Sequence, residues 1–210
     1  RNRVRDGMAY VQVTRGVAPR DHVFPDAGTP PSVVITARST DRSKAEALAQ
    51  KGISVITLPD NRWERVDIKT VSLLPNALAR QKAKEAGAKE AWFVDAKGYV
   101  TEGAATSFWI VDEHGVIRTP PLDHSILPGC TRAALLAELA EAGIAVEHRP
   151  FSLEEMRRAR EAFLTSATSF VKPILRIDGA PVGDGTVGPV ARRLFDIFAR
   201  HVRGGLKNAA

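Results

Sequence analysis

The order in which strand-like and helix-like segments alternate along the chain constrains the fold more than any single residue does. Residues 8–15 alternate polar and apolar side chains, which is the period of a half-buried strand. We expect further strands at residues 33–36, 53–58, 91–95, 107–111, 163–166 and 174–177, and helices at 41–50, 75–86, 131–142, after 152 and at 190–202. These strands are too irregularly spaced for a doubly wound sheet, so the sequence predicts a mixed α/β (α+β) fold.

Proline, glycine and a capping pattern mark the expected helix ends. Pro75 suits a first helical turn, and Gly87 suits the position after the last turn. Ser152 and Glu155 have the spacing of a capping box, in which each side chain accepts a hydrogen bond from the other residue's backbone. These three signals predict where two of the helices begin and where one of them ends.

The composition is that of an ordinary soluble globular chain, with 210 residues, 44% hydrophobic and 26% charged. No apolar run approaches the roughly 20 residues that span a bilayer, and the basic N-terminus is not followed by a signal-peptide core. The single cysteine, Cys130, excludes an internal disulfide and a multi-cysteine zinc site, and the five histidines lack metal-ligand spacing. We therefore expect a cytoplasmic protein with no metal and no membrane partner.

The formal net charge of +6 does not indicate a nucleic-acid partner. The lysines and arginines are scattered along the chain, and no aromatic residues interleave with them as a base-stacking surface requires. A basic surface of this kind suits solubility and attracts anionic ligands.

Lys69 is the first candidate for chemistry. It lies between apolar residues in segment 66–70, which has the pattern of a strand. Burial disfavours the charged form of a lysine and lowers its pKa, which frees the amine to form a Schiff base. The alternative is that Lys69 points outward from the strand into solvent.

Glu102 is the second candidate. It follows Lys69 by 33 residues and lies in a run of small residues before an aromatic strand. From such a loop a carboxylate can reach a ring nitrogen of a ligand. The alternative is a solvated loop residue.

Two segments are candidates for binding a phosphate group. Gly129, Cys130 and Thr131 lead into a helix, and a helix N-terminus offers free N–H groups and the positive end of the helix dipole. The hydroxyl-rich loop at residues 165–169 follows a strand and could meet the same anion. For the first segment, a plain helix cap without a ligand is the alternative.

Other readings of the same residues are weaker. The glycines near residues 98–103 and 183–188 lack the strand–loop–helix spacing and the lysine of a nucleotide-binding loop. Cys130 as a nucleophile with His124 as its base is a weak hypothesis, because the two are six residues apart before a helix start.

Taken in order, these segments resemble the class IV aminotransferases, which are pyridoxal-phosphate (PLP) enzymes of fold type IV. The shared pattern is a lysine on a strand, a T-E-G loop, an L-P-G-x-T-R helix start and a T-S-x-T-S loop, and it covers about residues 8–190. The resemblance implies that Lys69 forms the internal aldimine, that Glu102 pairs with the pyridine nitrogen and that Leu127 packs on the ring. It further implies phosphate contacts from Cys130, Thr131, Ser166, Ala167 and Thr168, and a place near the cofactor for Arg62.

The loop at residues 15–25 resembles the carboxylate trap of the D-amino-acid aminotransferases. There an arginine and a histidine from the partner subunit bind the substrate carboxylate, which implies Arg20 and His22 here. An arginine fork matches a carboxylate with two parallel hydrogen bonds. Ala167 departs from the threonine found in D-amino-acid members, so only its N–H could contribute to phosphate binding.

The resemblance also implies how the chain is organised. The family's N-terminal portion is absent, so we expect residues 1–42 to be the remnant of a small N-terminal domain and residues 43–210 to be the complete larger domain. The expected activity is transamination of D-amino acids, such as D-alanine with 2-oxoglutarate, by a homodimer. Alternatives are a branched-chain aminotransferase, an aminodeoxychorismate lyase, or an inactive anion-binding fragment.

Overall fold

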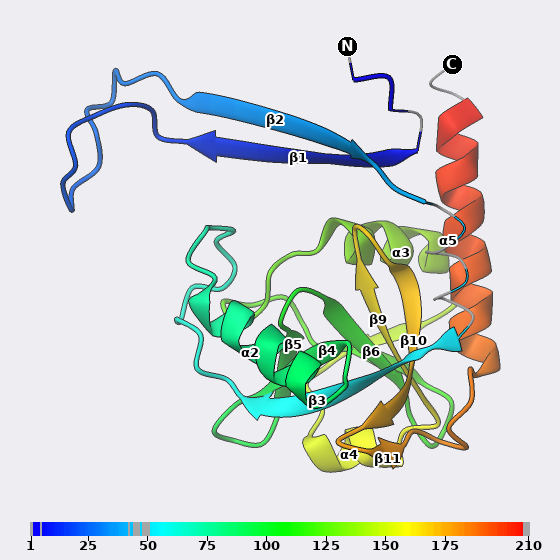
Figure 1. The fold of residues 1–210 in the computed structure, drawn as a ribbon. Helices are drawn as coiled ribbons and strands as arrows, with labels where there is room; N and C mark the ends of the chain where they lie inside the picture. The colour runs from blue at the N-terminus through cyan, green and yellow to red at the C-terminus, as the bar shows by residue number, and fades with distance from the viewer. Residues whose placement is uncertain (1, 5, 42, 44–46, 48–50, 208–210) are drawn as a thin grey trace. The chain divides into compact units, whose positions relative to one another are not determined.

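The computed structural model describes residues 2–4, 6–41, 43, 47 and 51–207, and it divides into two compact units, Arg1–Ala45 and Glu46–Ala210 (Figure 1). The helix expected at residues 41–50 falls mostly outside the described residues. Each unit is described by itself below.

The first unit is a two-stranded antiparallel ribbon with a long connecting loop. Strand β1 (Gly7–Thr14) pairs with β2 (Ser32–Ser39), so the strands expected at residues 8–15 and 33–36 are both present. Tyr10 and Val11 point to opposite faces of the ribbon, and both are more than half exposed. The ribbon therefore has no buried core on either face.

The second unit is built on a mixed sheet that has nine strands among the described residues. They are β3 (Ile53–Pro59), β4 (Glu90–Val94), β5 (Val100–Gly103), β6 (Ser107–Val111), β7 (Ile117–Thr119), β8 (Val146–His148), β9 (Glu161–Ser166), β10 (Phe170–Ile177) and β11 (Ala180–Pro181). The order is β5-β4-β3-β10-β9-β6-β7-β8, and β11 pairs with β10. Strand β3 runs parallel to β4 and β10, β7 runs parallel to β8, and the other pairs are antiparallel. The predicted mixed α/β class is confirmed.

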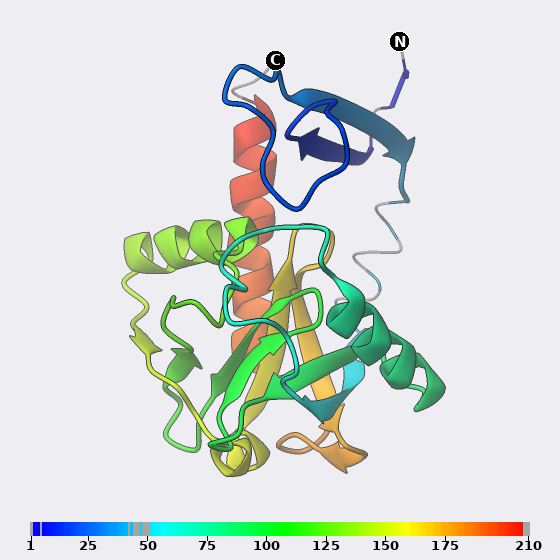
Figure 2. The ribbon, with the colours of Figure 1, turned by 90° about the vertical axis from the view of Figure 1, so that its left-hand side faces the viewer.

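Four described helices pack around this sheet (Figures 1 and 2). They are α2 (Leu74–Glu85), α3 (Cys130–Glu141), α4 (Leu153–Arg158) and α5 (Pro189–Lys207). Helices α3 and α5 contact each other and strand β9, while α2 contacts β3 and β4. Among the described residues, no helix is both long enough and apolar enough to cross a membrane.

The sheet is buried on both faces. Phe108 and Trp109 are neighbours on β6 and point to opposite faces, so each belongs to a different apolar cluster. Trp109 stacks on Phe163 of β9 with 5.7 Å between ring centroids, and Leu194 of α5 packs in the same cluster. A third cluster joins α2 to Phe93 of β4. In agreement with burial on both faces, strands β4 and β6 contain continuous apolar runs at residues 91–94 and 108–111.

The sequence signals for helix ends are confirmed. Pro75 lies in the first turn of α2. The Ser152 hydroxyl accepts a hydrogen bond from the Glu155 amide at 3.1 Å, and the Glu155 carboxylate accepts one from the Ser152 amide at 3.0 Å. This capping box closes the start of α4, and the Glu155 carboxylate also forms an ion pair with Arg149.

Candidate active site

A cavity of about 660 Å³ lies within the second unit, between α2, the β5–β6 turn, the start of α3 and the β9–β10 turn. This volume is within the range of small-molecule sites. Its walls include most of the residues that the sequence singled out, namely Arg62, Lys69, Glu102, Leu127, Cys130, Thr131, Ser166 and Ala167. Segments far apart in the chain thus meet around one space.

Three expected site residues lie elsewhere. Thr168 is exposed in the turn between β9 and β10 and is not among the residues that line the cavity. Arg20 and His22 are exposed in the β1–β2 loop of the first unit. In that loop the Arg15 guanidinium lies 3.7 Å from the centre of the Phe24 ring.

The buried side chain of Glu102 lines the cavity. This residue lies on β5, where all four residues are buried, so the segment is a strand rather than the loop that the sequence predicted. Gly103 allows the tight β5–β6 turn, because a Cβ there would lie 2.2 Å from the Thr106 hydroxyl oxygen. The Glu102 side chain accepts a hydrogen bond from the Leu127 amide at 3.2 Å.

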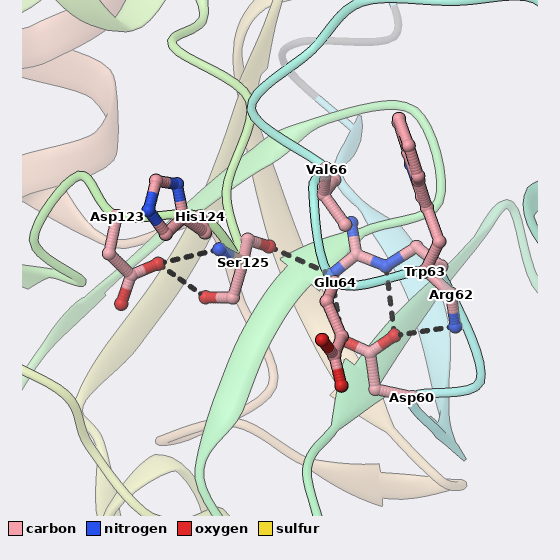
Figure 3. Close-up of a pocket in the computed structure, with 8 residues that line it drawn as sticks. All are labelled: Asp60, Arg62, Trp63, Glu64, Val66, Asp123, His124 and Ser125. Carbon is pink, nitrogen blue, oxygen red and sulfur yellow. Dashed lines mark hydrogen bonds and ion pairs between the residues drawn. The ribbon is translucent and has the colours of Figure 1, made fainter.

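Arg62 holds the other oxygen of Glu102. Its Nη1 donates to Glu102 Oε2 at 2.6 Å, and its Nη2 donates to the carbonyl of Ser125 at 3.1 Å. Nε and Nη2 also donate to the two oxygens of Asp60, at 2.9 and 2.7 Å (Figure 3). The guanidinium lies 4.6 Å from the centre of the Phe93 ring, and the Arg62 side chain is only 2% exposed. Arg62 is therefore fixed on several sides.

Burial raises the pKa of Glu102 to about 7, against the lowering effect of Arg62. The nearby Asp60 carboxylate adds to this rise. Close to neutral pH the carboxyl of Glu102 is thus able to hold or release a proton. Perturbed carboxyl groups of this kind are concentrated at functional sites.

Lys69 lies at the rim of the cavity, in a conformation that differs from the expected one. Residues 61–73 follow an irregular path, so the strand expected around Lys69 is not formed, and the side chain is exposed rather than buried. The path is held by a hydrogen bond from the Asp67 amide to the carbonyl of His124 and by one from the Ile68 amide to Arg65. Neighbouring apolar side chains face outward, and Val71 is 72% exposed. An apolar run alone does not distinguish a strand from such a segment.

The start of α3 forms another wall. The described contacts give its N-cap, Gly129, no side-chain hydrogen bond, and no acidic residue lies in the first turn. A Cβ at position 129 would lie 2.7 Å from Ser107 Oγ, so glycine permits the close approach of helix and strand. Thr131 is buried and Cys130 is exposed toward the cavity. The first N–H groups of a helix lack intrahelical partners and suit an anion.

A smaller pocket of about 360 Å³ shares Arg62, Trp63 and Val66 with the larger cavity (Figure 3). Its lining comprises Asp60, Arg62, Trp63, Glu64, Val66, Asp123, His124 and Ser125. Nδ1 of His124 lies 3.5 Å from the Asp67 carboxylate, whereas Cys130 lines the larger cavity. The contacts of these two residues give no support to the hypothesis of a cysteine nucleophile with His124 as its base.

Comparison with known proteins identifies the family. The family model described as "Amino-transferase class IV" matches residues 1–177 of this chain. The chain belongs to the class IV aminotransferase family. It is 37% identical to a D-alanine aminotransferase of Staphylococcus haemolyticus, over 96% of this chain and 70% of the relative. It is 41% identical to one of Bacillus licheniformis, over 92% of this chain and 66% of the relative.

Solved structures agree with this class IV assignment. A branched-chain amino acid aminotransferase of Escherichia coli superposes with a TM-score of 0.79 at 27% identity, covering 90% of this chain and 63% of that chain. A T.th. branched-chain amino acid aminotransferase with pyridoxamine 5'-phosphate superposes with a TM-score of 0.80 at 30% identity, covering 93% and 66%. The chain therefore spans slightly less than two thirds of these solved chains, and the predicted fold type IV is confirmed.

Sequence reasoning missed several residues in and around this cavity. Asp60 and Thr101 hold Arg62, and Arg132 is a buried cation that lines the cavity. A signal for Asp60 is present in the sequence, because an acid directly after a strand and two residues before an arginine can fold back onto it. Arg132 is part of the L-P-G-x-T-R pattern, but a pattern does not reveal that this residue is only 3% exposed, because its burial depends on the fold.

Proposed function

We propose that this chain is the larger part of a PLP-dependent aminotransferase that acts on D-amino acids, for instance by moving the amino group of D-alanine to 2-oxoglutarate. The family is that of the class IV aminotransferases, and the relatives named D-alanine aminotransferase are 34–41% identical to this chain over the aligned residues. The observation that carries the proposal is the gathering of a lysine, a buried carboxylate and a helix N-terminus around one cavity.

The lining residues fit PLP chemically. The cavity offers an amine at Lys69, a carboxyl that can share a proton at Glu102, and an N-terminal helix turn without a side-chain cap at Cys130 and Thr131. The proposed phosphate contacts are the amides and hydroxyls of Cys130, Thr131, Ser166, Ala167 and Thr168. Thr168 has the weakest support, because it is exposed and does not line the cavity.

Each protein group has a proposed task in the reaction. When bound, PLP supplies an electron sink that stabilises negative charge at the substrate Cα. Lys69 Nζ would hold the cofactor, and it would afterwards take the proton from the substrate Cα as a general base and deliver it to C4′ of the cofactor as a general acid. Glu102 would share a proton with the ring nitrogen and Leu127 would contact the ring, while Arg62 keeps the Glu102 carboxylate in position.

Substrate selection is proposed for the first unit. Arg20 and His22 would bind the α-carboxylate of the amino acid, and the 2-oxo acid would use the same residues. In the proposed assembly, a homodimer in the cytoplasm, they act on the cavity of the partner subunit. Their exposure and the arginine fork are compatible with this task.

The test combines an absorbance scan with product analysis. The purified chain is mixed with PLP and scanned for a visible band, and turnover is then measured with D-alanine, L-leucine and aminodeoxychorismate. We expect the band and a preference for D-alanine. A preference for L-leucine would establish the branched-chain alternative, pyruvate from aminodeoxychorismate would establish the lyase, and the absence of the band would leave an inactive anion-binding fragment.

A further inference from the structure

Asp60 is the buried acidic neighbour of the Arg62–Glu102 pair. It follows directly on β3, and its backbone amide donates to the carbonyl of Val94 at 2.8 Å. Its side chain is 14% exposed, and Thr101 Oγ1 donates to Asp60 Oδ2 at 2.6 Å. Both carboxylate oxygens also accept hydrogen bonds from the Arg62 guanidinium. Asp60 is thus oriented by Thr101 and faces Arg62 (Figure 3).

The charges of Asp60, Arg62 and Glu102 do not balance when all three groups are ionised. One guanidinium then faces two carboxylates, and the net charge of the group is negative. Uncompensated charge is costly in a buried site, and neutralisation of one carboxyl relieves that cost. Glu102 is the less exposed of the two carboxylates, and Asp60 has the bidentate contact with Arg62. The proton is therefore expected on Glu102.

We propose that Asp60 is a positioning residue for Glu102: it anchors the Arg62 guanidinium and takes up its positive charge, so that the Glu102 carboxyl carries a proton near neutral pH. This proton is the one that a pyridine nitrogen would share. The inference deepens the proposed function and rests on it only for that consequence. The lowered pKa of Asp60 and the raised pKa of Glu102 agree in direction with this division of charge.

Other charged groups face Glu102 from the neighbouring elements. Arg132 of α3 interacts electrostatically with Glu102, and Lys69 lines the same cavity. The guanidinium of Arg132 favours the ionised carboxylate, so it cannot cause Glu102 to hold a proton. Burial of Glu102 and the negative charge of Asp60 both raise the pKa of Glu102, so they favour its protonated form.

The experiment measures the pKa of Glu102 in the cofactor-free chain. Glutamate is labelled with 13C at the carboxyl carbon, the Glu102 signal is assigned from its loss in Glu102→Gln, and the signal is titrated. In Asp60→Asn the positive charge of Arg62 acts on Glu102 alone. The pKa of Glu102 should then fall by about one unit, the lower end of the range for a nearby charge.

Matched variants separate charge from structure. Asp60→Glu keeps the negative charge and should leave the pKa of Glu102 closer to that of the wild type than Asp60→Asn does. Asp178→Asn also removes a carboxylate that accepts two hydrogen bonds from β3, at Thr57, but it should leave the Glu102 signal unchanged. Asp60→Ser provides a second neutral side chain if Asp60→Asn does not fold.

The direction of the shift decides the result. If Asp60 had a structural role only, its loss would release Arg62 and the pKa of Glu102 would rise. A rise, or an unchanged value, in a folded neutral variant overturns the inference. The visible band of the PLP-loaded wild type is read separately, so the failure of the proposed function and the failure of this inference give different outcomes.

Discussion

The two units of this chain differ in how they define the positions of their functional side chains. The unit Glu46–Ala210 has three apolar clusters, and most of the candidate cofactor residues surround a cavity inside it. The unit Arg1–Ala45 is a ribbon whose apolar side chains are largely exposed, and it carries Arg20 and His22 on a loop. The proposed cofactor binding therefore depends on packing within one unit, whereas the proposed substrate selection depends on a loop without a core.

The Lys69 substitution should have the largest effect, and it tests the role of the second unit, Glu46–Ala210. Lys69→Ala removes the proposed proton-transferring amine, so turnover should fall by up to about 10⁴-fold, and the visible band should disappear. Borohydride reduction with PLP and peptide mapping should place the added mass on Lys69. The control is Lys97→Ala, an exposed lysine in the β4–β5 turn. Label on another lysine would contradict the assignment.

The second prediction concerns the stability of the two units. Phe93 is 1% exposed and lies beneath the Arg62 guanidinium, so Phe93→Ala should lower the free energy of unfolding by about 3–5 kcal/mol. Val13 of the ribbon is 59% exposed, and Val13→Ala should change the free energy by no more than about 0.5 kcal/mol. Urea unfolding measures both values. Equal costs would show that the ribbon is buried in solution, for example in an assembly.

The third prediction concerns the dependence of stability on pH. The folded pKa of Glu102 is about 7, above its ordinary value of 4.5, so between these values the folded state binds more protons than the unfolded state. The wild type should therefore lose stability as pH rises through this window. The glutamine in Glu102→Gln does not ionise. The unfolding free energy of this variant relative to the wild type should therefore grow by on the order of 2–3 kcal/mol between pH 4.5 and 8.

Urea unfolding of cofactor-free protein at several pH values measures this difference. The control is Glu113→Gln, whose side chain is 55% exposed, and its difference from the wild type should stay nearly constant with pH. If the difference in unfolding free energy between Glu102→Gln and the wild type did not grow with pH, the pKa of Glu102 would not be raised in the folded state.

The sequence predicted the second unit, Glu46–Ala210, well where the signals were local. The capping box at Ser152 and Glu155 and the apolar strand at Phe108 and Trp109 depend on neighbours in the chain, and the structure has them. The strand around Lys69 was wrong, because an apolar run does not reveal whether another element covers it. Contacts between distant segments were not predictable by spacing, as the Asp60–Arg62–Glu102 group shows.

The ribbon was predicted as well as the core, yet its function depends on something other than its own fold. Strand β1 follows from alternation and β2 was expected at residues 33–36, and their register is regular from Gly7 opposite Ser39 to Thr14 opposite Ser32. The positions of Arg20 and His22 do not follow from that register, since loop 15–31 lies outside the paired strands. The role of Arg20 therefore rests on the family resemblance and on experiment.

The smallest predicted effect is that of Arg20, and it tests whether the ribbon unit selects the substrate. Loss of a charged hydrogen bond costs about 1.5–3 kcal/mol, so Arg20→Ala should lower kcat/KM for D-alanine by about tenfold to a hundredfold. The loss should come mainly from a higher KM, while the visible band stays, because the cofactor residues lie in the other unit. Arg38→Ala, on β2 of the same ribbon, is the matched control. Turnover of both alanine enantiomers by the wild type and the two variants gives the measurement.

A guanidinium fork fixes the direction of a carboxylate as well as its charge, so the preference for D- over L-alanine should also weaken in Arg20→Ala. An unchanged ratio would remove Arg20 from substrate selection, and a wild-type preference for L-alanine would remove the D-amino-acid assignment from the whole chain.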